Sequence, residues 1–392
     1  MYVLIIATLI LIGNWALEYY RHLRYVNAIP IRIHVNGTRG KSSLTRLISA
    51  GLRAGGLVTV GKTTGTLPRI LLPDGKEASI VRLMGANIIE QKYIFRYAAS
   101  MKPDAIVIEC MAVNPAYQWI TERKFVRSTI GVITNARPDH LDLMGSTVQS
   151  VAMCLSNTLP AKGVAFTAED EQFHILKRVA KQRHTKLHKI RPHDVTDEEM
   201  AEFSYIEHKD NVQLALAVCA QAGVSREVAL KGMQSSNPDP GALKKYSHNN
   251  ENKEFTFYNV FAANDPSSTE FIFKLITKNL EDGVTKLLIL NNRADRYFRS
   301  QQLVDICHNL NYDYLLLTGE IPEKVYAYAM QENLPKEKVL PIGQIPMEEL
   351  YTKISSLAKS KAHIIGIGNI ADQAKYGASI VKFFKNKSNG KN

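Results

Sequence analysis

The chain has 392 residues, of which 45% are hydrophobic and 22% are charged. This composition excludes a disordered, collagen-like or fibrous protein, and the length favours two domains of roughly 150–200 residues each. Lys and Arg number 49 against 37 Asp and Glu, a net charge of +12, which indicates an anionic partner such as a nucleotide, nucleic acid, acidic polymer or lipid headgroup. The four cysteines are widely separated, which argues against a zinc knuckle or disulfide framework and fits a reducing compartment.

The N-terminus is apolar. Residues 2–17 carry no charge, and basic residues follow at 21–24. A membrane-spanning helix needs about 20 apolar residues, with a lower limit near 17, which the segment meets if Tyr19 and Tyr20 are interfacial aromatics. Because the basic residues come after the apolar run, the body of the protein is expected in the cytoplasm. We predict a membrane-anchor helix over 1–27; the alternative is a helix packed on the body.

Strand and helix patterns alternate along the rest of the chain. This order predicts an α/β fold in which parallel sheets are covered by helices on both faces. Turn formers and charges cluster at 235–255, the expected domain boundary, and the basic tail 382–392 is expected to fray. The predicted strands are 31–35, 105–109, 129–134, 163–167, 255–260, 286–290, 314–318 and 363–368.

A phosphate-binding loop is the sharpest local signal. Strand 31–35 runs into a glycine-bearing turn that opens a helical pattern, where free backbone N–H groups and the helix dipole hold phosphate. We expect Lys41 to reach the terminal phosphates and the Ser42 hydroxyl to bind Mg²⁺. Two residues separate the glycines, fewer than in the general loop. The predicted loop residues are Gly37, Thr38, Arg39, Gly40, Lys41, Ser42 and Ser43.

Two further groups of polar residues follow later strands. Glu109 ends the strand 105–109, and the segment 135–142, which includes His140, follows the strand 129–134. The carboxyl ends of parallel strands meet at the ligand crevice, so both groups are expected to face the phosphates. Glu109 offers an oxygen ligand for Mg²⁺ and His140 an imidazole. The alternative is that they are helix caps or surface charges.

These motifs together carry a family resemblance. GTRGKS (37–42), Glu109, NARPDHLD (135–142) and the helix pattern at 208–215 resemble the Mur ligase superfamily, which includes cell-wall amino-acid ligases and folylpolyglutamate synthases. Further motifs, like the apolar N-terminus, resemble the capsule-type poly-γ-glutamate synthetase subunit. They are GKTTGT (61–66), GANIIEQK (85–92), ECMAVNP (109–115), NPDPGA (237–242), FAANDPSST (261–269), NNRADR (291–296) and GIGN (366–369).

The resemblance implies a Mur-ligase-like, P-loop ATP-binding domain over 28–240 and a smaller Rossmann-like ligase domain over 241–392. It implies an ATP-dependent, ADP-forming amide ligase that polymerises glutamate through γ-amide bonds, with an acyl-phosphate intermediate and Mg²⁺. The expected partners are glutamate, the poly-γ-glutamate chain and the membrane subunits of a synthesis and export complex, together with a homo-oligomer; nucleic acid is not expected. The expected location is the cell membrane, with the catalytic body on the cytoplasmic side.

The resemblance also implies roles for individual residues. Lys41, Glu109, His140 and Asp295 are the expected catalytic residues. Ser42 and Glu109 are expected to hold the first Mg²⁺ and His140 a second. Asn211 is expected to contact adenine, and Asp295 and Arg296 to close the site from the C-terminal domain. Cys154 aligns with the carbamylated lysine of cell-wall ligases, a departure that bears on the second metal.

A growing poly-γ-glutamate chain is a polyanion. Arginine suits bidentate carboxylate recognition, and three arginines lie close together after strand 286–290. These arginines are candidates for binding the poly-γ-glutamate chain. The alternative is that they form a solvated surface and that one of them makes a contact when the two domains close. Asn264 and Asp265 stand where the wider family has D-Y-A-H-N-P. The candidate substrate residues are Asn264, Asp265, Arg293 and Arg299.

Three other readings come from different classes of protein. A folylpolyglutamate-synthase-like enzyme explains the two-domain length but not the apolar N-terminus. A P-loop protein that couples ATP to nucleic-acid binding fits the net charge, but the sequence has no basic patch interleaved with aromatic residues. An ATP-gated scaffold without catalysis is disfavoured by the intact Lys41, Glu109 and His140.

Overall fold

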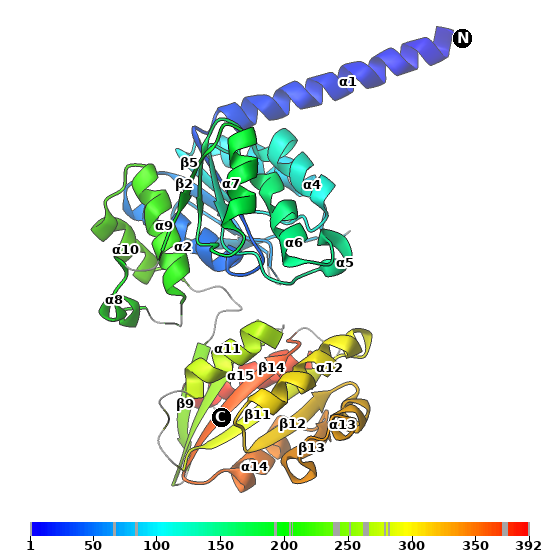
Figure 1. The fold of residues 1–392 in the computed structure, drawn as a ribbon, viewed down its shortest axis with the longest axis vertical. Helices are drawn as coiled ribbons and strands as arrows, with labels where there is room; N and C mark the ends of the chain where they lie inside the picture. The colour runs from blue at the N-terminus through cyan, green and yellow to red at the C-terminus, as the bar shows by residue number, and fades with distance from the viewer. Residues whose placement is uncertain are drawn as a thin grey trace. The chain divides into compact units, whose positions relative to one another are not determined.

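The computed structural model describes most of the chain in two compact units, 1–239 and 240–392, which are coloured from blue to red along the sequence in Figure 1. Each unit is described by itself. The described residues are 2–65, 68–82, 85–191, 194–203, 205, 207–237, 244–250, 252–261, 266–277, 280, 283–370 and 375–390.

The N-terminal unit is built on an eight-stranded sheet. Six neighbouring strands are parallel, and β3 and β4 extend one edge in antiparallel pairing. In sheet order the strands are β4 (Glu77–Ser79), β3 (Arg69–Leu71), β2 (Thr59–Lys62), β5 (Ala105–Glu109), β1 (Ile31–Asn36), β6 (Ile130–Ile133), β7 (Val164–Thr167) and β8 (Lys186–Lys189). Because β5 and β6 flank β1 on opposite sides, the loop after β1 lies at the point where the strand order reverses. In parallel α/β sheets this is where ligands bind.

Helices cover this sheet. Helix α2 packs on β1, β2 and β5, and α9 and α10 pack on α2. Helix α3 and the base of α1 cover other core residues of β2 and β5. Helices α6 and α7 pack with β6 and β7. The helices are α1 (Tyr2–Asn27), α2 (Lys41–Ala54), α3 (Glu90–Ser100), α4 (Pro115–Ile120), η1 (Thr121–Val126), α5 (Leu141–Met144), α6 (Val148–Leu155), η2 (Ser156–Thr158), α7 (Phe173–Gln182), α8 (Asp197–Ala201), α9 (Lys209–Gln221) and α10 (Arg226–Gln234).

Helix α1 is the one helix among the described residues that is long and apolar enough to cross a membrane. Figure 1 shows its N-terminal part extending beyond the rest of the unit, and the side chains of its apolar stretch are exposed. Only its base packs on the body: His22 and Val26 are buried, and the His22 Nε2 lies 3.0 Å from the Phe125 carbonyl oxygen. The exposed part is available to a membrane, which is weak evidence for an anchor.

The C-terminal unit has a six-stranded sheet in which β9 is the antiparallel edge strand. Alternate side chains of β11 point to opposite faces, so Leu288 and Leu290 pack under α11, α12 and α13, and Leu287 and Ile289 under α14 and α15. The strands in sheet order are β13 (Val339–Gly343), β12 (Tyr314–Gly319), β11 (Thr285–Asn292), β14 (Lys361–Gly368), β10 (Lys253–Asn259) and β9 (Lys244–Asn250). The helices are α11 (Pro266–Thr277), η4 (Ala294–Arg296), α12 (Tyr297–Asp305), η5 (Ile306–Asn309), α13 (Pro322–Gln331), η6 (Lys336–Lys338), α14 (Met347–Leu357) and α15 (Tyr376–Ser388).

The α/β prediction is confirmed, and each of the eight predicted strands is present with bounds shifted by a few residues at most. The prediction of a frayed tail is wrong for the described residues. Helix α15 runs to Ser388, and Phe384 is buried and stacks on Phe257 with ring centroids 4.5 Å apart. Ile380 and Phe384, four residues apart on one helix face, hold the tail against the sheet.

Candidate functional site

The loop 37–40 joins β1 to α2 in a conformation that depends on glycine. Gly37 has φ +133° and Gly40, the N-cap of α2, has φ +80°. A Cβ on Gly37 would lie 1.9 Å from the Thr134 Oγ1, so the loop passes too close to the β6 end for any side chain. The Lys41 Nζ donates to the carbonyl oxygens of Gly37 (2.7 Å) and Thr38 (3.1 Å). The loop therefore combines a helix N-terminus with an ammonium group.

The segment after β6 fixes this loop. The Thr38 hydroxyl donates to the Asn135 Oδ1 at 2.6 Å, and the Arg39 N–H donates to the same oxygen at 3.1 Å. The Thr134 hydroxyl donates to the Arg39 carbonyl oxygen at 2.6 Å. These bonds hold the loop before any ligand binds, which lowers the entropic cost of binding.

Ser42 and Glu109 come together although 67 residues separate them in sequence. The Ser42 hydroxyl donates to the Glu109 Oε2 at 2.8 Å, and the Thr64 N–H donates to the same oxygen at 2.6 Å. Glu109 is 2% exposed and pairs in register with Val35 of β1. A hydroxyl and a carboxylate are hard oxygen ligands, and Mg²⁺ takes one or two carboxylates with phosphate oxygens and water completing its shell. The residues present therefore fit Mg²⁺ held jointly with a nucleotide.

A buried lysine lies at the neighbouring strand end. Lys62, the last residue of β2, is fully buried, and its Nζ lies 2.7 Å from the Glu90 Oε1. Burial lowers the pKa of Lys62, although Glu90 opposes the shift. Arg82 also binds Glu90, with nitrogen–oxygen distances of 2.7 and 3.0 Å. Sequence reasoning missed this network, although Lys62 and Glu90 both fall in motifs quoted above.

His140 lies apart from the Ser42–Glu109 pair in its contacts. It has φ +44°, its side chain is 52% exposed, and its Nε2 lies 3.9 Å from the Asp139 Oδ1. Asp139 in turn lies 3.5 Å from the Arg39 guanidinium. Within the described part of the chain, three or more His, Cys, Asp or Glu side chains do not gather into a metal site. A second metal on His140 thus stays a prediction.

Cys154 is a buried thiol in α6. The Gln118 Nε2 donates to its sulfur at 3.1 Å, and burial raises its pKa to about 11. A protonated thiol in the core lacks the amine needed for a carbamate and is a poor metal ligand.

Asn211 lies directly against the phosphate loop. A Cβ on Gly40 would lie 2.8 Å from the Asn211 Oδ1, so these two residues are in close contact. Glu207 accepts hydrogen bonds from the Asn211 Nδ2 at 2.9 Å and the Ser43 hydroxyl at 2.5 Å. Glu207 is a site residue that sequence reasoning missed; its one signal was its place directly before the 208–215 motif.

In the C-terminal unit, Arg293 follows β11 and pairs with Asp295. The Arg293 guanidinium donates to both carboxylate oxygens, at 2.9 and 2.7 Å, and this lowers the pKa of Asp295. The backbone N–H of Ala294 donates to Glu320 at 2.9 Å. Arg296 is exposed and Arg299 half-buried; Asn264 and Asp265 lie outside the described residues.

A buried ion pair lies beneath the loop, on β1. The His34 Nδ1 lies 2.8 Å from the Glu122 Oε2, and both side chains are almost fully buried. Burial alone lowers the pKa of His34, but Cys110 and Glu122 outweigh it and raise the pKa to about 9. The imidazolium therefore ties the strand that carries the loop to η1.

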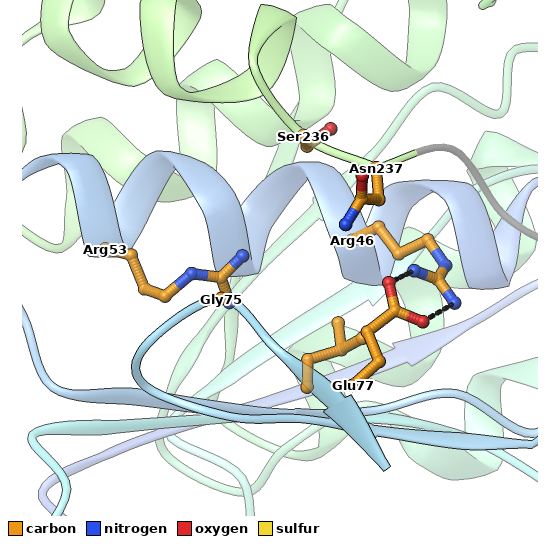
Figure 2. A pocket seen from close by; sticks show the side chains of 7 residues that line it. Arg46, Arg53, Gly75, Glu77, Ser236 and Asn237 are labelled. Atoms are coloured by element: carbon orange, nitrogen blue, oxygen red, sulfur yellow. Dashed lines mark hydrogen bonds and ion pairs between the residues drawn. The ribbon is translucent and has the colours of Figure 1, made fainter. Parts of the chain in front are cut away.

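A small pocket lies along α2, away from the loop. Figure 2 shows Arg46 and Arg53 on this helix, Glu77 facing Arg46, and Ser236 and Asn237 opposite. Arg46 binds both Glu77 oxygens and so fastens α2 to β4. The residues that line the pocket come from α2, the β3–β4 hairpin and the segment after α10. The pocket is therefore not the phosphate site.

Comparison with known families and proteins gives consistent results across the chain. Residues 35–237 match the Mur ligase middle domain, and residues 245–386 match the poly-gamma-glutamate synthase CapB C-terminal domain. The chain is 36% identical over 376 residues to PGA synthase CapB of Bacillus subtilis, covering 94% of this chain and 95% of that protein. It is 34% identical over 365 residues to the capsule biosynthesis protein CapB of Bacillus anthracis, covering 92% and 78%.

Solved structures share the fold. E. coli FolC in complex with ADP matches with a TM-score of 0.70 at 14% identity, covering 95% of this chain and 93% of that one. A bifunctional folylpolyglutamate synthase/dihydrofolate synthase with Mn, AMPPNP and L-glutamate bound matches with a TM-score of 0.65 at 14% identity, covering 93% and 92%. From its sequence relatives and family matches, the chain belongs to the CapB family of poly-γ-glutamate synthases, with the Mur ligase fold.

Proposed function

We propose that this chain joins glutamate residues through γ-amide bonds and that the reaction passes through an acyl phosphate. The family is that of the poly-γ-glutamate synthases, so the chain is an ATP-dependent amide ligase that makes polyglutamate. The observation that carries the proposal is the meeting of Ser42 and Glu109 beside the Lys41 loop. Polar groups at this place suit phosphoryl transfer, which depends on positioning and on neutralising negative charge.

The proposed chemistry has two steps. First, a γ-carboxylate oxygen bonds to the γ-phosphorus of ATP, the bond to the bridging oxygen breaks, and ADP leaves. Then the α-amine of a second glutamate bonds to the acyl carbon, the bond to the phosphate oxygen breaks, and inorganic phosphate leaves as the amine loses a proton. The first step is needed because a free carboxylate is a poor electrophile.

The residues of the loop have distinct proposed roles. Lys41 and the backbone N–H groups of 37–42 offset the phosphate charge. Ser42 and Glu109 hold Mg²⁺, which supplies further positive charge at the phosphates. A divalent metal and a nucleotide are bound in a solved structure of the same fold, and L-glutamate in that structure supports glutamate as the substrate. We propose further that His140 holds a second metal.

The proposal extends to residues beyond the loop. We place Asn211 at the adenine, in keeping with its contact with Gly40. Asp295 and Arg296 serve the nucleotide from the C-terminal unit. Arg293 and Arg299 bind the glutamate chain, and Asp295 would then compete with that chain for the Arg293 guanidinium.

The proposed location is the cytoplasmic side of the cell membrane. Helix α1 is the anchor, and Arg21 and Arg24 after its apolar run favour a cytoplasmic body. Extension of a polymer destined for a capsule implies membrane subunits that carry it outward. A relative is called a capsule biosynthesis protein, which supports this role. Homo-oligomer formation remains part of the proposal.

Trapping of the intermediate tests the proposal. The full chain, in membranes with ATP, Mg²⁺ and glutamate, is incubated with hydroxylamine, which competes with the amine for an acyl phosphate. We expect the ADP and the inorganic phosphate released each to equal the γ-glutamyl hydroxamate plus the amide bonds formed, with the hydroxamate share rising as hydroxylamine is added. The Lys41→Ala variant should form at least about a hundredfold less hydroxamate. Release of AMP and pyrophosphate in place of ADP would mean activation through an adenylate and would contradict the proposal.

A further inference from the structure

A cluster of exposed basic and aromatic side chains surrounds the base of α1. It comes from three elements that pack together there: α1 itself, α3 and η1. We call this surface the collar. Its residues are Arg21 and Arg24 on α1, Tyr93 and Arg96 on α3, and Arg123 and Lys124 on η1.

We propose that the collar lies against the headgroups of an anionic lipid bilayer, so that the body of the protein is held against the membrane surface as well as tethered to it. The proposal rests on the proposed insertion of α1. It goes beyond anchoring, because a tether alone leaves the catalytic body free to tumble, whereas a docked collar fixes which face of the N-terminal unit meets the lipid.

Contacts between α1 and α3 set the depth of the collar. Glu18 forms an ion pair with Lys92, and one turn further along the rings of His22 and Phe95 are 5.8 Å apart. The two helices therefore advance side by side away from the apolar segment. The start of α3 lies level with Glu18, which directly follows the last apolar residue of the run, Leu17.

Tyr93 consequently lies at the depth of the membrane interface. It is next to Lys92, and it is 66% exposed. Tyr19 and Tyr20 occupy the same level on α1, and Tyr20 is 69% exposed. Tyrosine is enriched at this depth in membrane proteins, because its ring is apolar and its hydroxyl is polar.

The basic side chains of η1 lie slightly farther from the hydrocarbon core than Tyr93 does, on the cytoplasmic side. His22 contacts the Phe125 carbonyl of η1. His22 comes four residues after Glu18 on α1, so η1 lies about 6 Å farther along the α1 axis than Glu18. This matches a headgroup layer about 5–7 Å thick on each side of the hydrocarbon. Arg123 and Lys124 directly precede Phe125, so their long side chains can reach the lipid phosphates.

The charge of the collar favours anionic lipid. Its five charged members are all basic. The acidic groups nearest in these elements are engaged elsewhere: Glu18 pairs with Lys92, Glu90 with Lys62 and Arg82, and buried Glu122 with His34. Basic residues close to a bilayer are attracted to anionic headgroups. Continuity with α1 favours lipid over a soluble polyanion as the occupant.

A single tryptophan placed in the collar tests this proposal in the full chain. The chain has two tryptophans, so Trp15→Phe with Trp119→Phe leaves Tyr93→Trp as the one reporter. The protein is reconstituted in phosphatidylcholine vesicles, with or without about 30% phosphatidylglycerol, that carry a nitroxide on a fraction of the headgroups. The matched control is Val228→Trp in the same background. Val228 is an exposed position of α10, a helix that lies away from α1 in Figure 1.

We expect the nitroxide to quench Tyr93→Trp at least about twice as strongly as Val228→Trp, and more strongly with phosphatidylglycerol. Charge reversal should remove the dependence on anionic lipid. Arg96→Glu or Lys124→Glu should bring the quenching in mixed vesicles down to the phosphatidylcholine value. Lys231→Glu, an equal charge change at an exposed position of α10, should leave the quenching unchanged.

Flotation of the same samples in high salt separates the possible failures. If the protein floats with the vesicles but Tyr93→Trp is quenched no more than Val228→Trp, α1 inserts and the collar proposal is wrong. A protein covering this surface in the cell would give that same result in vesicles alone. If the protein does not float, the anchor fails and the collar proposal fails with it.

Discussion

At the scale of single residues, the site consists of few groups with well-defined contacts. Lys41 binds two loop carbonyls, and Ser42, Thr64 and Glu109 meet at one carboxylate oxygen. The Lys41 ammonium donates hydrogen bonds to carbonyl oxygens of the loop, and Lys41 is not part of the core. Its removal should therefore affect ligand binding much more than folding.

The Lys41→Ala variant tests the loop. We expect ATP turnover to fall by about 10²–10³-fold, because a positive charge aimed at the transferred phosphate is lost. The free energy of unfolding should fall by no more than about 2 kcal/mol, because Lys41 is half-buried and its two hydrogen bonds are confined to the loop. Steady-state ADP release and thermal unfolding measure the two effects, and Lys41→Arg, which keeps the charge, should retain part of the activity. ATP turnover at the parent rate would contradict the assignment.

The Glu109→Gln variant tests the metal site. The substitution keeps the size of the side chain but removes the charge that suits Mg²⁺. We expect the Mg²⁺ concentration for half-maximal activity to rise roughly tenfold or more, together with a large loss of rate. The measurement is a Mg²⁺ titration of ATP turnover.

Glu207→Gln is the matched control for this titration. It makes the same chemical change at a different carboxylate near the loop, since Glu207 contacts Ser43 and Asn211 and not Ser42. We expect it to raise the KM for ATP without moving the Mg²⁺ midpoint. Equal midpoints for the parent and Glu109→Gln would show that Glu109 does not bind the metal.

At the scale of elements, the His34–Glu122 pair connects β1, the strand that leads into the loop, to η1. The folded-state pKa of His34 is raised to about 9 from 6.5. The pair therefore stabilises the fold fully below pH 6.5, and its contribution is lost as the pH rises through 9. A shift of this size corresponds to on the order of 3 kcal/mol.

Urea unfolding between pH 6 and 9.5 tests this prediction. Both tryptophans lie in the N-terminal unit, so their fluorescence reports on that unit. We expect the urea midpoint of the parent to fall from pH 6.5 to 9 and the midpoint of His34→Gln to change much less. Parallel pH profiles for the two proteins would mean that His34 is neutral in the folded state.

Local sequence signals predicted the element that carries the site, but not all of its surroundings. The strand–turn–helix pattern of β1, the glycine turn and α2 can be recognised from residues that are adjacent in sequence. The rule that parallel strands end at one edge then predicted that Glu109 approaches Ser42. By contrast, Lys62 looks like an ordinary surface lysine in sequence. It is buried because tertiary packing brings Glu90 and Arg82 around it.

The short and terminal elements were missed for similar reasons. Strands β3 and β4 have three residues each, too few to show a periodic pattern. They are stabilised by strand pairing, β3 with β2 and β4 with β3. The C-terminal helix α15 is rich in lysine, and its charge concealed the apolar pair Ile380 and Phe384. Glu207 lacks a signature of its own, because its role depends on where α9 packs.

At the scale of the whole molecule, α1 carries an exposed apolar segment, and only the base of this helix packs on the N-terminal unit. Deletion of residues 1–20 should move the protein from the membrane to the soluble fraction and leave a folded, ATP-binding body. The deletion removes the exposed Glu18–Lys92 pair, which contributes little because solvent screens it, but keeps the buried His22 and Val26. Cell fractionation, nucleotide binding and thermal unfolding measure the outcome.

Deletion of residues 1–27 is the contrasting variant. It also removes His22 and Val26, which are buried against α3 and η1, so it should lower the unfolding temperature by several degrees more than the shorter deletion. If the 1–20 deletion itself aggregated or unfolded without cooperativity, the apolar segment would be a core helix and the anchor would be wrong.

The most direct test of the central claim is incorporation of radiolabelled glutamate by membranes that contain the full chain. With ATP and Mg²⁺, we predict a polyanionic product that γ-glutamyl hydrolase degrades and α-peptidases leave intact, with one ADP released for each bond formed. Membranes with Lys41→Ala should incorporate at least about a hundredfold less glutamate. A product with α-linkages, or equal incorporation by the parent and Lys41→Ala membranes, would contradict the account.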